Sequence, residues 1–201
     1  MTVRMNGNKT VYAGWQKQTG KNPFIDVSES DWFYDDVMYV YENGLMLGTS
    51  DTMFSPHGAI TRAMMATILW RMEGSPAPAS APDFTDVASG KWYSDAIAWT
   101  TENGVYLGYG NGRFGPDDPI TREQLAAGFY RYAAYKGGDV RVNGELDTFA
   151  DEDNVSAWAQ DAMSWAVASG LMQGRNGNVL DPQGTATRAE AAAMLHRFAE
   201  K

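Results

Sequence analysis

The chain has no cysteine among its 201 residues. Disulfides, thiolate metal sites and cysteine nucleophiles are therefore excluded. Basic residues are also scarce, since 16 Lys and Arg stand against 25 Asp and Glu, which gives a formal net charge of −9. This balance argues against binding to nucleic acid or to an anionic membrane surface, because both would repel the protein.

Long apolar runs and catalytic signatures are absent as well. No stretch approaches the length of a membrane span, so membrane insertion is not expected. Residues 1–20 lack the charged-then-apolar layout of a signal peptide, and we expect the chain to be a piece of a longer protein. His57 and His196 stand at non-equivalent places, and no Gly-x-Ser-x-Gly or His-x-x-x-His motif occurs. We therefore expect no enzyme activity and no cofactor.

What the sequence does contain is one motif written three times. Each copy has Thr-Arg at the start of a run whose apolar residues are spaced as on one face of a helix. The copies are Ile60–Met64, Ile120–Gln124 and Ala186–Glu190. Thr occupies the N-cap position, and Gln124 and Glu190 complete a capping box in the second and third copies. The motif therefore predicts three helices that begin at the Arg.

An Arg recurs in the first turn of each predicted helix. The three are Arg62, Arg122 and Arg188. Unpaired backbone N–H groups and the positive end of the helix dipole disfavour a cation there. A nearby anion would remove the conflict. It could be a ligand carboxylate held by two hydrogen bonds, or a carboxylate of the protein itself.

Further landmarks precede each copy at constant spacing. The distance from a Trp to a Gly is 12 residues each time, and from that Gly to the Arg it is 18. A second Gly follows four residues after the first, and an Asp precedes the Trp. The Asp residues are Asp26, Asp86 and Asp151, the Trp residues are Trp32, Trp92 and Trp158, and the second Gly residues are Gly48, Gly108 and Gly174. So constant a period predicts three copies of one supersecondary unit.

Each unit is predicted to be helix, loop, helix. The first helix should run from about the Trp to the residue before the first Gly, which suits a left-handed C′ position. Its core positions would be Val37 and Val40, Ile97 and Thr100, Met163 and Ala166. Two short helices cannot bury their apolar faces alone, so the units should close on one another. We expect repeats at 22–76, 82–138 and 147–201, with 22–201 as one cooperative unit.

Together the Phe-x-Asp-Val, Trp, Gly-x-x-x-Gly, Phe-x-Pro and Thr-Arg-Ala-Glu motifs resemble the S-layer homology (SLH) domain over residues 22–201. The resemblance implies a mainly α fold, with three helix-loop-helix repeats in a pseudo-threefold, three-pronged arrangement and short extended segments. It also implies an extracellular anchor on the bacterial cell wall, with a signal peptide upstream. Its partner would be a secondary cell-wall polysaccharide, typically pyruvylated, held in grooves between repeats.

The resemblance implies that the recurring Arg, Asp, Trp and second Gly residues line those grooves. Each type also has a structural alternative. The Asp could bond sugar hydroxyls, cap the first helix or pair with the Arg. The Trp could stack on a sugar or pack in the core, and the Gly could admit a ligand or serve a turn.

Departures from the family pattern predict unequal grooves. Met64 replaces the motif's Glu in the first repeat, and Gln124 replaces it in the second. A protein-binding or spacer module that has lost glycan binding is therefore the alternative function. Metal binding is not expected, because the acidic pairs and triplets lack the EF-hand loop pattern.

Residues 1–21 lie outside the repeats and are expected to be a remnant of a preceding domain or a linker. Their segment Lys9–Trp15 resembles the last strand of an internalin-type B repeat.

Overall fold

The structure, a computed structural model, describes residues 20–141, 144–175 and 178–201. Within these ranges the chain forms six α-helices, two short 3-10 helices and no strand. The elements are α1 (Tyr34–Glu42), α2 (Arg62–Met72), α3 (Ser94–Glu102), α4 (Arg122–Tyr135), η1 (Glu152–Asn154), η2 (Ala157–Ala159), α5 (Gln160–Ala168) and α6 (Arg188–Ala199). The predicted mainly α class is confirmed. The strand expected within residues 9–15 lies outside the described residues.

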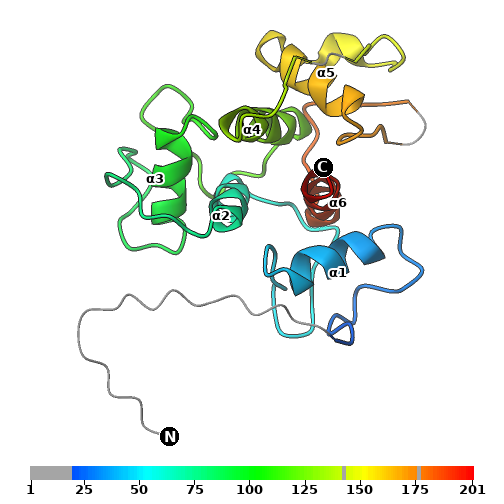
Figure 1. The fold of residues 1–201 in the computed structure, drawn as a ribbon, viewed down its shortest axis with the longest axis horizontal. Helices are drawn as coiled ribbons and strands as arrows, with labels where there is room; N and C mark the ends of the chain where they lie inside the picture. Colours follow the sequence, from blue (N-terminus) through cyan, green and yellow to red (C-terminus); the bar gives the residue numbers. More distant parts are fainter. Residues whose placement is uncertain (1–19, 142–143, 176–177) are drawn as a thin grey trace, which may run out of the picture.

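The second helix of each repeat lies at the centre of the molecule. Figure 1 shows α2, α4 and α6 side by side in the middle, with α1, α3 and α5 around them. Each outer helix packs against the central helix of the repeat before it: α3 against α2, α5 against α4, and α1 against α6. Each of the three prongs is therefore built from two repeats, and the predicted three-repeat arrangement is confirmed.

A closed ring of backbone hydrogen bonds joins the three extended segments that precede the central helices. The N–H of Ile60 donates to the carbonyl of Ala186 at 3.1 Å. The N–H of Ala186 donates to Ile120, and that of Ile120 donates back to Ile60, both at 2.9 Å. All three side chains are fully buried. The pseudo-threefold relation thus rests on main-chain bonds, to which each repeat contributes one donor and one acceptor.

The central helices begin where the sequence predicts. The hydroxyls of Thr61, Thr121 and Thr187 accept from the third backbone N–H of α2, α4 and α6, and the capping box is complete in α4 and α6. The first two N–H groups of each helix donate to carbonyls of the next repeat. In α2 these bonds run from Arg62 to Asp118 and from Ala63 to Pro116, each at 3.1 Å. The expectation of unpaired N–H groups at these helix starts is therefore wrong, because the neighbouring repeat occupies them.

The other local predictions are also confirmed. Gly44, Gly104 and Gly170 follow the outer helices with φ of 68°, 68° and 67°, the left-handed conformation expected at C′. The predicted core positions of the first helices are fully buried: Val37, Val40, Ile97, Thr100, Met163 and Ala166. Local sequence therefore determines the ends and the inward face of each outer helix.

We predict that residues 22–137 alone do not form a native structure. This fragment removes α5 and α6, so α1 loses the helix that covers its apolar face and α4 loses its outer partner. The exposed core should give a molten or aggregating product. Near-UV circular dichroism during heating would test this. A sharp, native-like transition for the fragment would contradict the single cooperative unit expected for residues 22–201.

Loss of an N-cap should weaken the fold measurably. Thr121→Ala and Thr187→Ala each remove the hydroxyl of a capping box, and each should lower the free energy of unfolding by about 1 kcal/mol. Urea denaturation would measure the loss. Thr52→Ala is the control, because that exposed residue caps no helix. A midpoint for Thr187→Ala that matches the control would mean that the cap contributes nothing.

Candidate functional site

The recurring Arg side chains are buried and reach into the loop of the next repeat. Only 4% of Arg62, 4% of Arg122 and 7% of Arg188 is exposed. The Nε of Arg62 donates to the carbonyl of Phe114 at 2.8 Å, and its Nη2 donates to Leu107 at 2.7 Å. The same two nitrogens make the equivalent bonds from Arg122 to Leu180 and Gln173, and from Arg188 to Phe54 and Leu47. Each Arg therefore ties its own repeat to the next.

These bonds also show how the protein accommodates a cation at a helix start. Two carbonyl oxygens, which carry partial negative charge, face each guanidinium. They take the place of the Asp carboxylate that was the alternative partner of the Arg. Of the ion pairs within the described ranges, none joins Asp26, Asp86 or Asp151 to one of the three recurring Arg residues. Replacing such an Arg would leave the loop carbonyls without donors, so loss of stability would accompany any loss of binding.

The recurring Asp residues clamp the same loop from the other side. Asp86 accepts from the N–H groups of Phe114 at 2.8 Å and Gly115 at 2.9 Å. Asp26 and Asp151 accept equivalent pairs, from Phe54 and Ser55 and from Leu180 and Asp181. The alternative roles of the Asp as a helix cap or as the partner of the Arg are therefore wrong. Phe114 has its N–H fixed by Asp86 of its own repeat and its carbonyl fixed by Arg62 of the preceding repeat.

The recurring Trp side chains lie at the surface. The exposed fractions of Trp32, Trp92 and Trp158 are 64%, 58% and 55%, so the alternative that they pack in the core is wrong. The rings of Trp32 and Trp92 meet the next aromatic ring edge to face, at 5.2 Å and 5.1 Å. An exposed indole held in a defined orientation presents a flat apolar surface to a ligand.

The second Gly of each repeat is required by packing within that repeat. A Cβ at Gly48 would lie 2.3 Å from the carbonyl oxygen of Ser50. At Gly108 it would lie 2.4 Å from the ring of Phe84, and at Gly174 it would lie 2.9 Å from that of Phe149. Close approach of the chain to itself therefore accounts for these residues.

Two cavities bring the recurring residues of all three repeats together. A cavity of about 500 Å³, which we call the Arg122 groove, is lined by Arg122 of the second repeat, Gly174 of the third and Trp32 of the first. A cavity of about 210 Å³, the Arg62 groove, is lined by the corresponding Arg62, Gly108 and Trp158. Arg188, Gly48 and Trp92 hold the equivalent sequence positions for the third pair of neighbouring repeats, and they line neither of these cavities. The recurring Asp residues line neither cavity. They bond to the backbone N–H groups of the loop instead.

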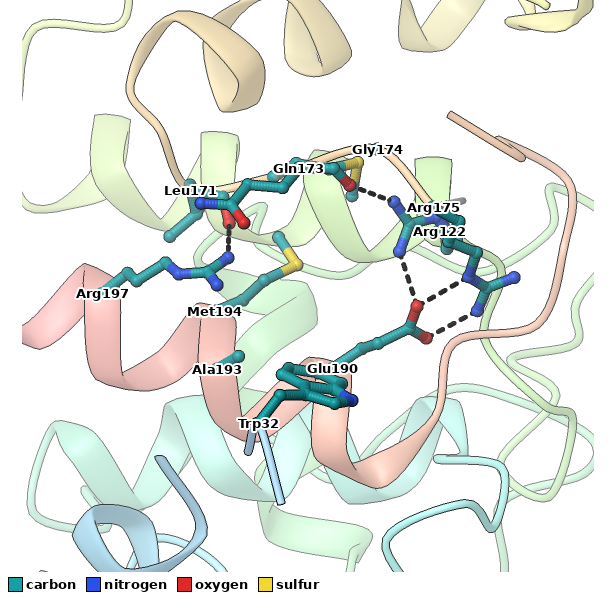
Figure 2. Close-up of a pocket in the computed structure, with 11 residues that line it drawn as sticks. Trp32, Arg122, Leu171, Gln173, Gly174, Arg175, Glu190, Ala193, Met194 and Arg197 are labelled. Atoms are coloured by element: carbon teal, nitrogen blue, oxygen red, sulfur yellow. Dashed lines mark hydrogen bonds and ion pairs between the residues drawn. The ribbon is translucent and has the colours of Figure 1, made fainter. Parts of the chain in front are cut away.

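The Arg122 groove contains an ion-pair network (Figure 2). The carboxylate of Glu190 lies between two guanidinium groups, 2.9 Å from Nη1 of Arg122 and 2.7 and 2.6 Å from Nε and Nη2 of Arg175. Arg175 also pairs with Asp181. Burial alone would raise the pKa of Glu190, but hydrogen bonds from Arg175 and Thr187 and the charge of Arg122 lower it below its usual range.

Several groove residues were not predicted from the sequence. Tyr106 and Arg131 line the Arg62 groove, and Arg175 and Arg197 line the Arg122 groove. One signal was present, because a second Arg follows the recurring Arg by nine residues in every repeat: Arg71, Arg131 and Arg197. The other positions differ between repeats, so periodicity alone could not identify them.

A family model, that of the S-layer homology domain, matches residues 23–66, 83–126 and 148–192. The chain is 34% identical over 174 residues to an S-layer protein of Bacillus thuringiensis subsp. finitimus, which covers 86% of this chain and 21% of that protein. It is 32% identical over 183 residues to an amylopullulanase of Thermoanaerobacterium thermosulfurigenes, which covers 89% of this chain and 10% of the enzyme.

A third relative is a cellulosome-anchoring protein of Acetivibrio thermocellus. It is 31% identical over 153 residues, which covers 74% of this chain and 34% of the relative. The chain therefore spans about a third or less of the length of each of these three relatives.

The loop clamp should make stability depend on pH. Burial would raise the pKa of Asp86, but the N–H groups of Phe114 and Gly115 and the charge of Arg113 lower it below its ordinary value. The pKa of Asp86 is therefore lower in the folded state than in the unfolded state. Ionised Asp86 contributes its full stabilisation of the fold above the unfolded-state pKa near 4, and this contribution is lost as pH falls through the folded-state pKa.

Asp86→Asn should therefore lower the melting temperature at pH 7 and flatten its decline between about pH 5 and pH 2. Thermal melts across that range would measure both effects. Asp83→Asn is the matched control, an exposed residue three positions earlier. If Asp86→Asn melts like the control at every pH, the clamp does not stabilise the fold.

Proposed function

Because the chain belongs to the S-layer homology (SLH) family, we propose that it is a non-catalytic anchoring module that binds a pyruvylated secondary cell-wall polysaccharide in the grooves between its repeats. SLH domains anchor surface proteins to the cell wall. The relatives include S-layer and cell-surface proteins, and we propose the bacterial cell surface as the location of this chain too. The enzyme relatives match only over a small part of their length, and that part is the SLH region.

The observation that carries the proposal is the composition of each groove. A buried guanidinium lies in the floor, and an exposed indole from a different repeat lies at the rim. Carbohydrate has both matching features when it bears an acidic substituent. The C–H face of a sugar ring can stack on Trp, and the carboxylate of a pyruvyl ketal can accept charge-assisted hydrogen bonds from Arg.

The exposure of the Trp residues favours this reading over a purely structural one. A large indole that is more than half exposed contributes little to the core, so its recurrence in all three repeats calls for another role. The negative charge of the whole chain would repel a polyanion at long range. Binding must therefore depend on the local cations of the groove, with their hydrogen-bonding geometry. Within the described residues no helix is both long and apolar enough to cross a bilayer, and attachment to a wall polymer needs none.

We predict that Trp158→Ala weakens binding to purified cell wall by roughly threefold to tenfold, the range expected for a stacked aromatic contact. The change should not lower the melting temperature much, because the ring is exposed. Sedimentation with wall preparations would measure the binding. Ile25→Ala is the control, since this apolar side chain is 81% exposed and lines neither cavity.

The polymer itself is tested by extracting the secondary polysaccharide from the wall before sedimentation. The wild-type protein should bind the intact wall and should not bind the extracted one. Undiminished binding to extracted wall would contradict the proposal. Equal binding to the polymer with and without its pyruvyl groups would show that the carboxylate is not recognised.

A further inference from the structure

The Arg62 and Arg122 grooves correspond residue by residue but differ in chemistry. Each groove contains a recurring Arg. Each also contains an Arg of the next repeat, nine residues after the recurring Arg of that repeat: Arg131 in the Arg62 groove and Arg197 in the Arg122 groove. Three lining positions change character: Gln124 corresponds to Glu190, Tyr106 to Met172, and Tyr109 to Arg175. These exchanges decide what remains available to a ligand.

In the Arg122 groove, the protein supplies its own anion. Nε and Nη2 of Arg122 donate to loop carbonyls, and Nη1 donates to Glu190. Arg175 likewise uses all three of its nitrogens, on Glu190, Asp181 and the carbonyl of Thr185. A ligand carboxylate entering here would have to displace the Glu190 carboxylate and would meet its charge. Figure 2 shows that carboxylate in the space between the two guanidinium groups.

In the Arg62 groove, no such anion is present. Gln124 is neutral, and its carbonyl oxygen accepts from the N–H of Thr121. Nη1 of Arg62 bonds to no residue that the structure describes, since only Nε and Nη2 have partners. Neither Arg62 nor Arg131 takes part in an ion pair within the described ranges. The guanidinium of Arg62 is held by the rings of Tyr109 at 4.5 Å and Phe114 at 4.8 Å.

A buried hydroxyl marks the same groove. The Oη of Tyr106 has no hydrogen-bond partner in the described structure, although the residue is 2% exposed and lines the cavity. The positive charges of Arg62 and Arg131 both act on this phenol. A buried donor without a partner is costly, and such groups are rare in folded proteins. An acceptor in the groove floor would satisfy it.

The sequence makes room for this phenol at a helix-interior position. A Cβ at Gly128 would lie 2.1 Å from the Tyr106 Oη, so only glycine fits there. In the other repeats the pair is Met46 with Ile68 and Met172 with Met194. Glycine inside a helix is unfavourable by about 1 kcal/mol relative to alanine. Gly128 therefore weakens α4 but leaves room for the Tyr106 hydroxyl.

We infer that the grooves are not equivalent: the Arg62 groove binds the acidic group of the polysaccharide through Arg62, Arg131 and the Tyr106 hydroxyl, and Glu190 keeps the Arg122 groove closed to it. This inference rests on the proposed function for the nature of the ligand. At the position equivalent to Tyr106, the first repeat, whose loop Arg188 contacts, has Met46 and so lacks the hydroxyl.

Calorimetric titration with soluble pyruvylated wall polysaccharide, and with the same polymer after removal of its pyruvyl groups, tests the assignment. Three matched variants change the equivalent Arg of each repeat: Arg131→Gln in the Arg62 groove, Arg197→Gln in the Arg122 groove, and Arg71→Gln in the first repeat. Arg131→Gln should weaken binding of the pyruvylated polymer about tenfold or more, as expected for a lost charge-assisted bond. The other two should change it less than about threefold. A loss for Arg197→Gln or Arg71→Gln as large as that for Arg131→Gln would overturn the inference.

Tyr106→Phe tests whether the Tyr106 hydroxyl contacts the ligand. Removing an unpartnered hydroxyl should leave the melting temperature unchanged or raise it, and we expect binding to weaken about fivefold or more. Tyr132→Phe is the control, because that hydroxyl bonds to Glu73 and lines neither cavity. Binding by Tyr106→Phe equal to that of the wild type would contradict the assigned role of the hydroxyl.

Glu190→Gln tests the closed groove. Glutamine already completes the capping box at the equivalent Gln124, so the fold should tolerate it. Removal of the internal carboxylate should add a second binding site for the pyruvylated polymer, and an unchanged stoichiometry would contradict this role of Glu190.

The outcomes for the wild type separate the two proposals. If it does not prefer the pyruvylated polymer, the proposed function fails and the inference fails with it. If it does prefer that polymer while Arg131→Gln and Tyr106→Phe bind like the wild type, only the inference is wrong.

Discussion

Hydrogen bonds from each repeat to the next stabilise this fold, and they join the three repeats in a cycle. Each central helix donates its first two N–H groups to the next repeat, and its Arg side chain donates two more bonds to the same loop. A buried polar group without a partner costs about 1–3 kcal/mol. A single repeat would lack the partners for these groups and would also lack a cover for its outer helix. The three repeats can therefore bury these groups in hydrogen-bonded form only together.

The same cross-repeat bonds create the grooves. To reach the carbonyls of Leu107 and Phe114, Arg62 must extend between two repeats, and this brings its guanidinium to the floor of the cleft that they form. Two of its nitrogens serve the fold, and the third faces no partner within the described residues. A recurring Arg in such repeats is thus first a structural residue. Its capacity to bind a ligand depends on what surrounds that last nitrogen.

How far the sequence predicted the structure depends on the range of each interaction. The Thr caps, the left-handed Gly44 and the buried Val37 follow from neighbours within a few residues, and all are confirmed. The partners of Arg62 and the exposure of Trp158 depend on which repeat packs against which, and no local pattern encodes that. The two structural alternatives for the Asp residues, a helix cap and a partner of the Arg, were wrong for this reason, since Asp86 bonds to a loop 28 residues away.

Comparison of the three repeats within this one chain separates scaffold from specificity. Positions whose side chains bond to the backbone at a helix start or in a loop keep their residue type all three times, as the recurring Thr, Arg and Asp do. Positions that line the two cavities vary: Gln124 and Glu190 correspond to Met64 of the first repeat, and Tyr109 and Arg175 correspond to Thr49. The fold constrains the first class because a change there would break a bond that holds a helix start or a loop in place. The second class is free to differ, and the grooves on one framework can therefore acquire different charge and hydrogen-bonding capacity without a change in architecture.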